Sequence, residues 1–231
     1  MSIRDLENKL FDDWSSSYIA PFVMDGLVNE ECWNAVNRKI LFVLKEANAG
    51  NRFDLRHDLN KGGRQETWQV LSEWAYGLLH LEENLSFREV VEVFGKIDRK
   101  DILRNLCIVN INKEPGGSVS KNRKLKETFH EKDRKYLPMQ LSLYEGVEII
   151  ICCGSVITPL FVTLFEDLYG YKYQPGQGHK FGGVWTYQIK NGPLLVSFYH
   201  PQQRRYSKEL LYNKLLNAVK EGLKLNYAPI H

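Results

Sequence analysis

Three runs of consecutive apolar residues divide the chain, and each ends abruptly in polar residues or glycine. They cover residues 39–44, 106–111 and 147–153. Continuous apolar runs are typical of strands that are buried on both faces, whereas half-exposed strands alternate apolar and polar positions. Helical periodicity fills the intervals between the runs. The pattern therefore predicts parallel strands joined by helices that cover both faces of one sheet.

A fourth apolar run, 194–199, ends in His200 and Pro201. Proline cannot continue a strand ladder, and it restricts the residue before it to an extended backbone. The run therefore predicts a buried strand with His200 at its carboxyl end. An earlier run, 184–189, is predicted to pair with it across an Asn-Gly turn at 191–192. Open α/β sheets bind ligands at the carboxyl ends of their strands, so His200 is a candidate site residue.

Helices are predicted between and after these strands. A helical spacing of apolar residues covers 65–80, and Ser86 with Glu89 forms a capping-box pattern at the start of a second helix. Further helices are predicted at 136–145, after the Gly154-Ser155 turn as far as Leu164, and at 207–225. Together the elements predict one domain over 1–231, a three-layer α/β/α sandwich with a central, mainly parallel sheet. Residues 1–38 are predicted to be an N-terminal extension that packs on it.

Composition limits the class of protein. The chain has 231 residues, 43% hydrophobic and 26% charged, with a net charge of +3, which is ordinary for a globular protein. That charge permits nucleic-acid binding without requiring it. No apolar run reaches the ~18 residues of a bilayer span, and the charged N-terminus has no signal-peptide core. We therefore expect a cytoplasmic monomer with no membrane partner.

The four cysteines are expected to be buried, reduced thiols. Their spacing contains no C-x-x-C pattern, and free cysteine is among the most buried residue types. The sequence therefore predicts neither a metal nor an iron–sulfur site, and no cofactor.

Polar residues that are candidates for a functional site follow the strands. Glu46 comes after the first strand, where it is either a site carboxylate or a solvated turn or capping residue. Asn110 ends the second strand, either as a turn-stabilising residue or as an amide that reads a base edge. Gly154 ends the third strand and opens a helix, either as a plain turn or beside an anion-binding helix N-terminus. His200 is either a site residue or, as is more common for a single histidine, a structural or exposed one.

The order of these strand ends resembles the uracil-DNA glycosylase superfamily. Residues 45–49, Lys-Glu-Ala-Asn-Ala, stand where that family has a Gly-Glu-Ala-Pro-Gly type motif. Val109-Asn110, followed by Lys113 and Pro115, resembles its Thr-Asn motif with Lys and Pro. A strand ending in Gly154 and a His200-Pro201 pair complete the likeness, which covers residues 39–225. The resemblance implies that family's α/β fold and a hydrolase that excises uracil or a related deaminated base from DNA, without forming a covalent intermediate.

The resemblance also implies residue roles. Glu46 would place the attacking water and His200 would stabilise the departing base, as the catalytic pair. Asn110 would read the base, with further substrate contacts from Ala47, Asn48 and Gly154. Phe53 would stack on the base, with Trp68 and Tyr199 as alternatives. The loop after His200 and the lysine of the second motif would bind DNA, including single-stranded or lesion-containing DNA, through Gln202, Gln203, Arg204, Arg205 and Lys113.

Several positions depart from the family's pattern. Lys45 replaces the motif glycine, Asn48 the proline and Gln202 the serine, and the cysteines that bind an iron–sulfur cluster in some branches are missing. Lys45 would either pair with Glu46 or contact a phosphate. The basic cluster 121–126 is either a solvated loop or a loop that grips the DNA backbone. Two alternatives to a glycosylase remain: a nucleotide- or nucleic-acid-binding domain without cleavage activity, and a small-molecule transferase or hydrolase on the same scaffold.

Overall fold

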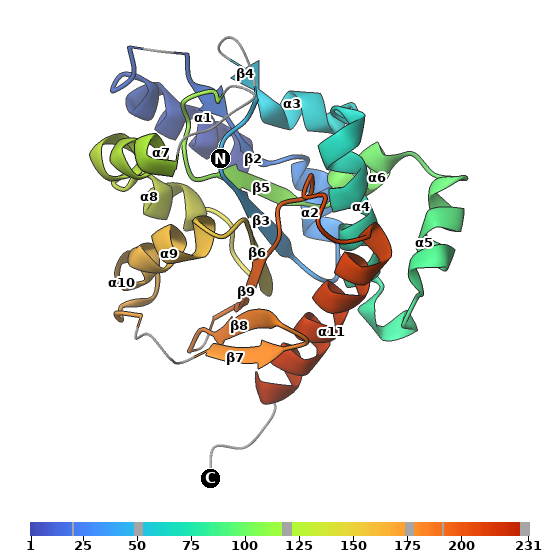
Figure 1. Cartoon of the computed structure of the whole chain (residues 1–231). Coiled ribbons are helices and arrows are strands. Elements are labelled where there is room, and N and C mark those ends of the chain that lie inside the picture. Colours follow the sequence, from blue (N-terminus) through green and yellow to red (C-terminus); the bar gives the residue numbers. More distant parts are fainter. Residues whose placement is uncertain (20, 49–52, 117–121, 174–177, 191, 227–231) are drawn as a thin grey trace.

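The protein folds around a seven-stranded sheet with helices on both faces (Figure 1). The computed structural model describes residues 1–19, 21–48, 53–116, 122–173, 178–190 and 192–226. From one edge to the other, the strands are β2 (Gly26–Leu27), β5 (Cys107–Asn110), β3 (Ile40–Leu44), β6 (Ile149–Cys153), β9 (Leu194–Phe198), β8 (Val184–Gln188) and β7 (Gly178–Phe181). The central four, β5, β3, β6 and β9, are parallel, and the outer strands are antiparallel to their neighbours.

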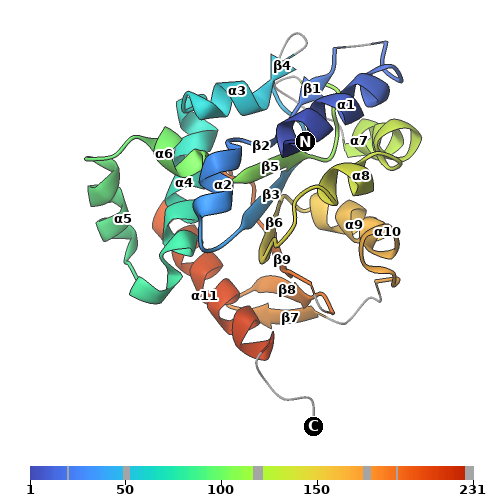
Figure 2. The same ribbon diagram turned by 180° about the vertical axis from the view of Figure 1, so that it is seen from behind.

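Helices form a layer on each side of this sheet, as the two opposite views show (Figures 1 and 2). One face is covered by α3 (Leu55–Asn60), α4 (Gln65–Leu79), α5 (Phe87–Phe94), α6 (Arg99–Leu103) and α11 (Lys208–Asn226). The other is covered by α1 (Ile3–Ser15), α7 (Asn122–Thr128), α8 (Leu137–Leu141), α9 (Ile157–Phe161) and α10 (Phe165–Tyr169). The short helix α2 (Glu30–Ala35) precedes β3, and β1 (Val23–Met24) pairs with β4 (Phe53–Asp54) in a separate small sheet.

The continuous apolar runs explain this layering. Successive side chains of a strand point to opposite faces, so Ile40, Phe42 and Leu44 enter one core while Leu41 and Val43 enter the other. All five are buried. Both faces of β3 therefore bury apolar surface, which is why it lies at the centre of the sheet.

The predicted α/β class and most predicted elements are confirmed. The apolar runs form β3, β5, β6 and the β8–β9 pair, although residue 191 of its turn lies outside the described residues. The Ser86 capping box begins α5, with Ser86 Oγ accepting from the Glu89 amide. Two helix predictions were too long. Only Leu137–Leu141 of 136–145 is α-helical, and the helix predicted through Leu164 is interrupted by a 3₁₀ turn at 162–164.

Residues 1–38 form part of the fold and not only an extension. Strand β2 belongs to the main sheet, where Leu27 pairs with Cys107. Two carboxylates of this segment, Glu7 and Asp25, are fully buried in the protein. Among the described residues, no helix combines the length and the apolar character that crossing a bilayer requires.

The strand order identifies the edge where a ligand site is expected. Along the chain, β5 is added on one side of β3, and β6 and then β9 on the other. The winding direction therefore reverses between β3 and β6, and ligands of open α/β sheets bind outside the carboxyl ends of the strands at such a point. The loops after these strands position the candidate site.

Candidate functional site

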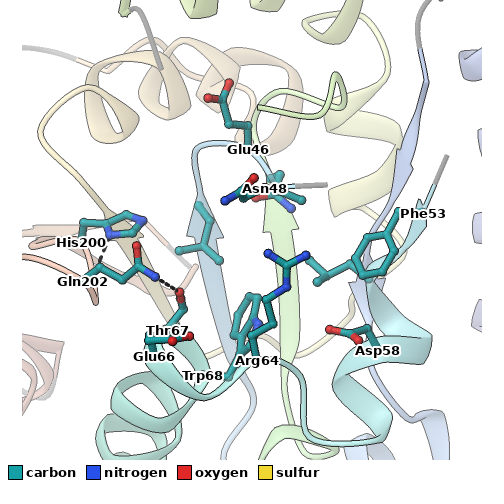
Figure 3. Close-up of a pocket in the computed structure, with 14 residues that line it drawn as sticks. Glu46, Asn48, Phe53, Asp58, Arg64, Glu66, Thr67, Trp68, His200 and Gln202 are labelled. Atoms are coloured by element: carbon teal, nitrogen blue, oxygen red, sulfur yellow. Dashed lines mark hydrogen bonds between the residues drawn. The ribbon is translucent and has the colours of Figure 1, made fainter. Parts of the chain in front are cut away.

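A cavity of about 240 Å³ opens at this carboxyl edge, on the side of α3 and α4 (Figure 3). Its walls come from the loops after β3 and β9, from the end of β5, from β4 and α3, and from the start of α4. All of the predicted catalytic and substrate-binding residues except Gly154 line it, namely Glu46, Ala47, Asn48, Phe53, Asn110 and His200. Gln202, from the predicted DNA-binding loop, lines it as well. Segments far apart in the sequence, from the loop after β3 to the loop after β9, thus meet at one cavity.

Glu46 is held by its neighbours in the β3 and β5 loops. Asn112 Nδ2 donates to Glu46 Oε2 at 3.1 Å, and Asn112 Oδ1 accepts from the Glu114 amide at 3.0 Å. Asn112 is only 3% exposed, so its own position is fixed. A Cβ at Gly116 would lie 2.4 Å from Glu46 Oε1, so any larger residue at this position would displace the carboxylate. One carboxylate oxygen is therefore anchored, and the other has no partner among the described residues.

His200 has a defined tautomer when it is neutral. Its Nδ1 accepts a hydrogen bond from the Gln202 amide at 3.1 Å, so the ring proton resides on Nε2. Burial lowers the pKa of His200 below its ordinary value, and the positive charge of Lys45 lowers it further. At neutral pH the residue is therefore a neutral imidazole whose Nε2–H can donate a hydrogen bond.

Asn110 is fixed from behind by a buried carboxylate. Asp25 Oδ2 accepts from the Asn110 amide at 2.8 Å and from its Nδ2 at 3.0 Å. Because a carboxylate only accepts, it dictates which side-chain atom of Asn110 faces it. The second Nδ2 hydrogen and the Oδ1 oxygen remain for other partners, and the orientation of the side-chain amide is fixed.

The aromatic walls come from Phe53 and Trp68. Both line the cavity, and Trp68 is 8% exposed. A Cβ at Gly63, where φ is +59°, would lie 2.5 Å from Trp68 Cδ1, so this glycine makes room for the indole. Tyr199 packs against Phe198 and Tyr206 and does not line the cavity.

The loop after His200 divides into structural and exposed residues. Gln202 Nε2 donates to Thr67 Oγ1 at 2.7 Å, which ties the loop to α4 (Figure 3). The Gln203 side chain bonds the backbone of Arg205 and Tyr206, so it shapes the loop rather than extending from it. Arg204 and Arg205 are exposed. Their contact with DNA stays a prediction.

The structure does not support a DNA contact by Lys113. Its side chain is fully buried, with Nζ 2.6 Å from Asp25 Oδ1 and 2.9 Å from the Asn110 carbonyl oxygen. The ammonium also lies 4.9 Å from the centre of the Trp14 ring. Lys113 therefore neutralises Asp25 behind the cavity and has no access to a phosphate.

Gly154 lies at the same edge but does not line the cavity. Its amide donates to the Phe198 carbonyl at 2.8 Å, and its φ of +126° is unfavourable for other residues. The structure gives it a role in the turn after β6 and no direct contact with the cavity.

Lys45 does not pair with Glu46. Its Nζ donates to Asn122 Oδ1 at 3.0 Å, so this lysine does not neutralise the Glu46 carboxylate. The predicted basic cluster 121–126 is partly helical, because α7 begins at Asn122, whereas Lys121 lies outside the described residues. Arg123 there is exposed and paired with Glu127.

Sequence reasoning missed four polar residues of the cavity, namely Asp58, Arg64, Glu66 and Thr67. All lie on or near the short connection from α3 to α4, where no strand pattern marks a site. The Arg64 side chain forms no hydrogen bond or ion pair with a described residue, and its guanidinium points into the cavity (Figure 3). An arginine immediately before a predicted helix, opposite the strand ends, was the available signal.

The prediction of buried, reduced cysteines is confirmed for three of the four, because Cys32 is only half-buried. All four cysteines are free, and Cys107, Cys152 and Cys153 are buried, with burial raising the pKa of each of these thiols. Within the described ranges, no group of three or more His, Cys, Asp or Glu side chains is arranged to hold a metal ion. A scan against protein-family models and a search of curated proteins each find no significant match to this chain.

Proposed function

We propose that the protein is a divergent member of the uracil-DNA glycosylase superfamily that hydrolyses the N-glycosidic bond of a flipped-out uracil or related deaminated base. The convergence of Glu46, Asn110 and His200 on one cavity carries the proposal. Enzymes that act on a base must take it out of the helix into a pocket. The volume of about 240 Å³ is below the range of roughly 300–1,000 Å³ for pockets that bind drug-sized ligands. It suits a single base.

His200 acts on the leaving group in this mechanism. As the C1′–N bond breaks, its electron pair moves onto the base and negative charge develops on the base oxygens. A neutral imidazole that donates through Nε2 stabilises this charge without first losing a proton. Donors already aimed at developing charge are among the largest contributions to catalysis.

Glu46 acts on the sugar. The carboxylate stabilises the positive charge on the deoxyribose and accepts a proton from the attacking water, whose oxygen forms the new bond to C1′. The bond from Asn112 holds one oxygen, and the other is available to the water. Because Lys45 is bonded to Asn122, we expect water to be the nucleophile and no Schiff base to form.

Asn110 selects the base. Its remaining donor and acceptor complement the acceptor and donor of the uracil amide edge, whereas cytosine presents a different pattern there. Asp25 keeps this pair of groups in one orientation. Phe53 and Trp68 supply apolar ring surface beside the base, and the exposed Arg204 and Arg205 would contact the DNA backbone.

Base release from defined oligonucleotides tests the proposal. Single- and double-stranded oligonucleotides carrying uracil, hypoxanthine or xanthine are incubated with the protein, and abasic sites are cleaved with alkali. We expect Glu46→Gln to lower the rate sharply with little loss of DNA affinity, because the lost interaction belongs to the transition state. His200→Ala should lower the rate by about 10²- to 10³-fold. Glu145→Gln, an exposed carboxylate after α8, is the matched control and should keep full activity.

A second candidate function is binding of a nucleotide without cleavage. The Arg64 guanidinium in the cavity has no partner in the described part of the chain, which favours a ligand that carries its own phosphate. In that case deoxyuridine monophosphate would bind to the protein, and Arg64→Ala would weaken the binding. No oligonucleotide would lose its base.

A further inference from the structure

Trp185 on β8 differs from the other tryptophans in its exposure. It is 43% exposed, whereas Trp68 is 8% exposed and Trp14, Trp33 and Trp74 are fully buried. A large ring left in water on a sheet face, outside any core, is available to a partner. The exposed ring is therefore a surface on which a flat ligand can stack.

The surroundings of Trp185 extend this flat surface and add positive charge. Tyr187 is stacked against it, with ring centres 6.5 Å apart and planes at 19°, and Tyr173 meets Tyr187 edge-on. Lys180 is the cross-strand partner of Trp185 in the β7–β8 pair, and its Nζ lies 5.4 Å from the ring centre. The hairpin thus presents aromatic rings beside an ammonium group.

Basic charge is concentrated in this part of the chain. The segment 168–208, which forms β7, β8, β9 and the His200 loop, contains no Asp or Glu. It contains six basic residues, namely Lys172, Lys180, Lys190, Arg204, Arg205 and Lys208. Since the whole chain has a net charge of only +3, the remainder is acidic on balance. Charge and rings together fit a polyanion with exposed aromatic groups.

The hairpin also reaches the carboxyl edge of the sheet, where the cavity opens. Trp185 pairs with Ser197 on β9, three residues before His200. At ~3.3 Å per residue, Trp185 lies about 10 Å below His200 along the strand direction. The turn between β7 and β8 is at the same carboxyl edge. Trp185 and its partner Ser197 lie on the α9–α10 face of the sheet, because their neighbours Val184 and Val196 point into the core on the α4 face. The cavity opens on the side of α3 and α4, so a nucleic-acid strand that contacts both sites must cross the carboxyl edge.

We propose that the β7–β8 hairpin binds single-stranded nucleic acid, with a base stacked on Trp185 and Lys180 on a backbone phosphate. The bases of a single strand are free to stack on aromatic side chains, whereas those of a duplex are not. This inference rests on the proposed function, because it makes a single-stranded region the preferred substrate. It concerns a surface separate from the cavity, so the two can be tested apart.

Fluorescence anisotropy of a dye-labelled oligonucleotide measures the affinity of every variant, and intrinsic tryptophan fluorescence reports stacking in the wild type. An oligonucleotide of deoxyadenosine, which carries no deaminated base, is titrated into the protein at low salt. Because Trp185 is the exposed indole among the five, stacking on it should quench part of the emission. Trp185→Ala should weaken binding by about 5- to 150-fold, the loss of one stacked base, and Trp185→Phe should keep most of the affinity. Lys180→Ala should reduce the slope of log K against log salt by about 0.7.

Matched controls lie on α5 and just after it. Val91 is 47% exposed and Lys96 is exposed, and Val91→Ala and Lys96→Ala should leave binding unchanged. Equal affinity of Trp185→Ala and Val91→Ala would overturn the inference, and so would an absence of binding at low salt. Self-association that requires Trp185, without oligonucleotide binding, would also overturn it and assign the surface to a second copy.

Two further results separate this inference from the proposed function. His200→Ala should bind the deoxyadenosine oligonucleotide like the wild type, whatever its base-release activity. If the wild type releases bases but Trp185→Ala does so equally well on single strands, the hairpin inference fails and the glycosylase proposal stands. If binding needs Trp185 but no base is released, the reverse holds.

Discussion

Replacing Asp25 by Asn should destabilise the whole protein through one buried ion pair. The Asp25 carboxylate and the Lys113 ammonium are both fully buried and lie 2.6 Å apart. The hydrogen-bond partners of the Asp25 carboxylate are all donors. They are Lys113 Nζ, the backbone amide and side-chain Nδ2 of Asn110, and Gln140 Nε2. An asparagine would remove the countercharge of Lys113 and turn its own amide group toward donors.

The expected cost follows from that geometry. Breaking a buried ion pair by removing one partner costs ~3–5 kcal/mol, because the other charge is left buried and alone. The free energy of unfolding of a domain is about 5–15 kcal/mol, so this is a large share of it. For a chain of this length each kcal/mol lowers Tm by about 2–4 °C, which gives a decrease of roughly 6–20 °C.

Urea unfolding followed by circular dichroism measures the effect. The double variant Asp25→Asn, Lys113→Met should recover a substantial part of the loss, because it removes both unmatched charges. Glu92→Gln is the control, since Glu92 is exposed and its pair with Arg88 lies in solvent. If Asp25→Asn costs less than about 1 kcal/mol, or if the double variant is as unstable as the two single losses added together, the pair does not hold this part of the structure.

Three further predictions concern individual groups. Lys45→Gln should raise the pKa of His200 only part of the way to its ordinary value, because burial, the larger cause, remains. NMR titration of the imidazole, with the signal assigned by comparison with His200→Ala, measures this pKa. An unchanged pKa in Lys45→Gln would contradict the prediction. Asn112→Ala should lower kcat for base release with KM nearly unchanged, because Glu46 loses its anchor. Asn112→Asp should lower kcat further, because its carboxylate repels that of Glu46. Equal kcat for the wild type and both variants would exclude the positioning role. Burial raises the pKa of Asp133 to about 7, so the native state binds an additional proton between pH 4 and 7, and the free energy of unfolding falls as pH rises through that window. Asp133→Asn should remove this decrease between pH 5 and 7.5, as measured by urea unfolding. An identical decrease in both proteins would refute the assignment.

The core of the fold follows directly from the sequence pattern. Strands β3, β5, β6 and β9 bury both faces, so their apolar runs are continuous and end sharply. Four parallel strands necessarily bring their carboxyl ends to one edge, which is why Glu46, Asn110 and His200 could be grouped before their positions were known. The short strands β1, β2 and β4 have two residues each, too few to show a period.

The remaining misses concern side-chain environment. Lysine is rarely buried, and Lys113 is buried because Asp25, 88 positions away, supplies a countercharge. No local pattern contains that information. Arg64 and Thr67 enter the cavity because the α3–α4 connection folds over the strand ends. Strand β7, Gly-His-Lys-Phe, lacks an apolar pattern because it is an edge strand, and its pairing with β8 creates the Trp185 surface.

The most direct test of the central claim is release of a free base from a uracil-containing single-stranded oligonucleotide, followed by chromatography of the products. We expect the wild-type protein to release uracil and to leave an intact abasic strand, with no adduct trapped by borohydride. Glu46→Gln and His200→Ala should bind the same oligonucleotide and release the base far more slowly. If the wild type releases no base from uracil, hypoxanthine or xanthine substrates while it still binds them, the cavity is a binding site and the proposed hydrolysis is wrong.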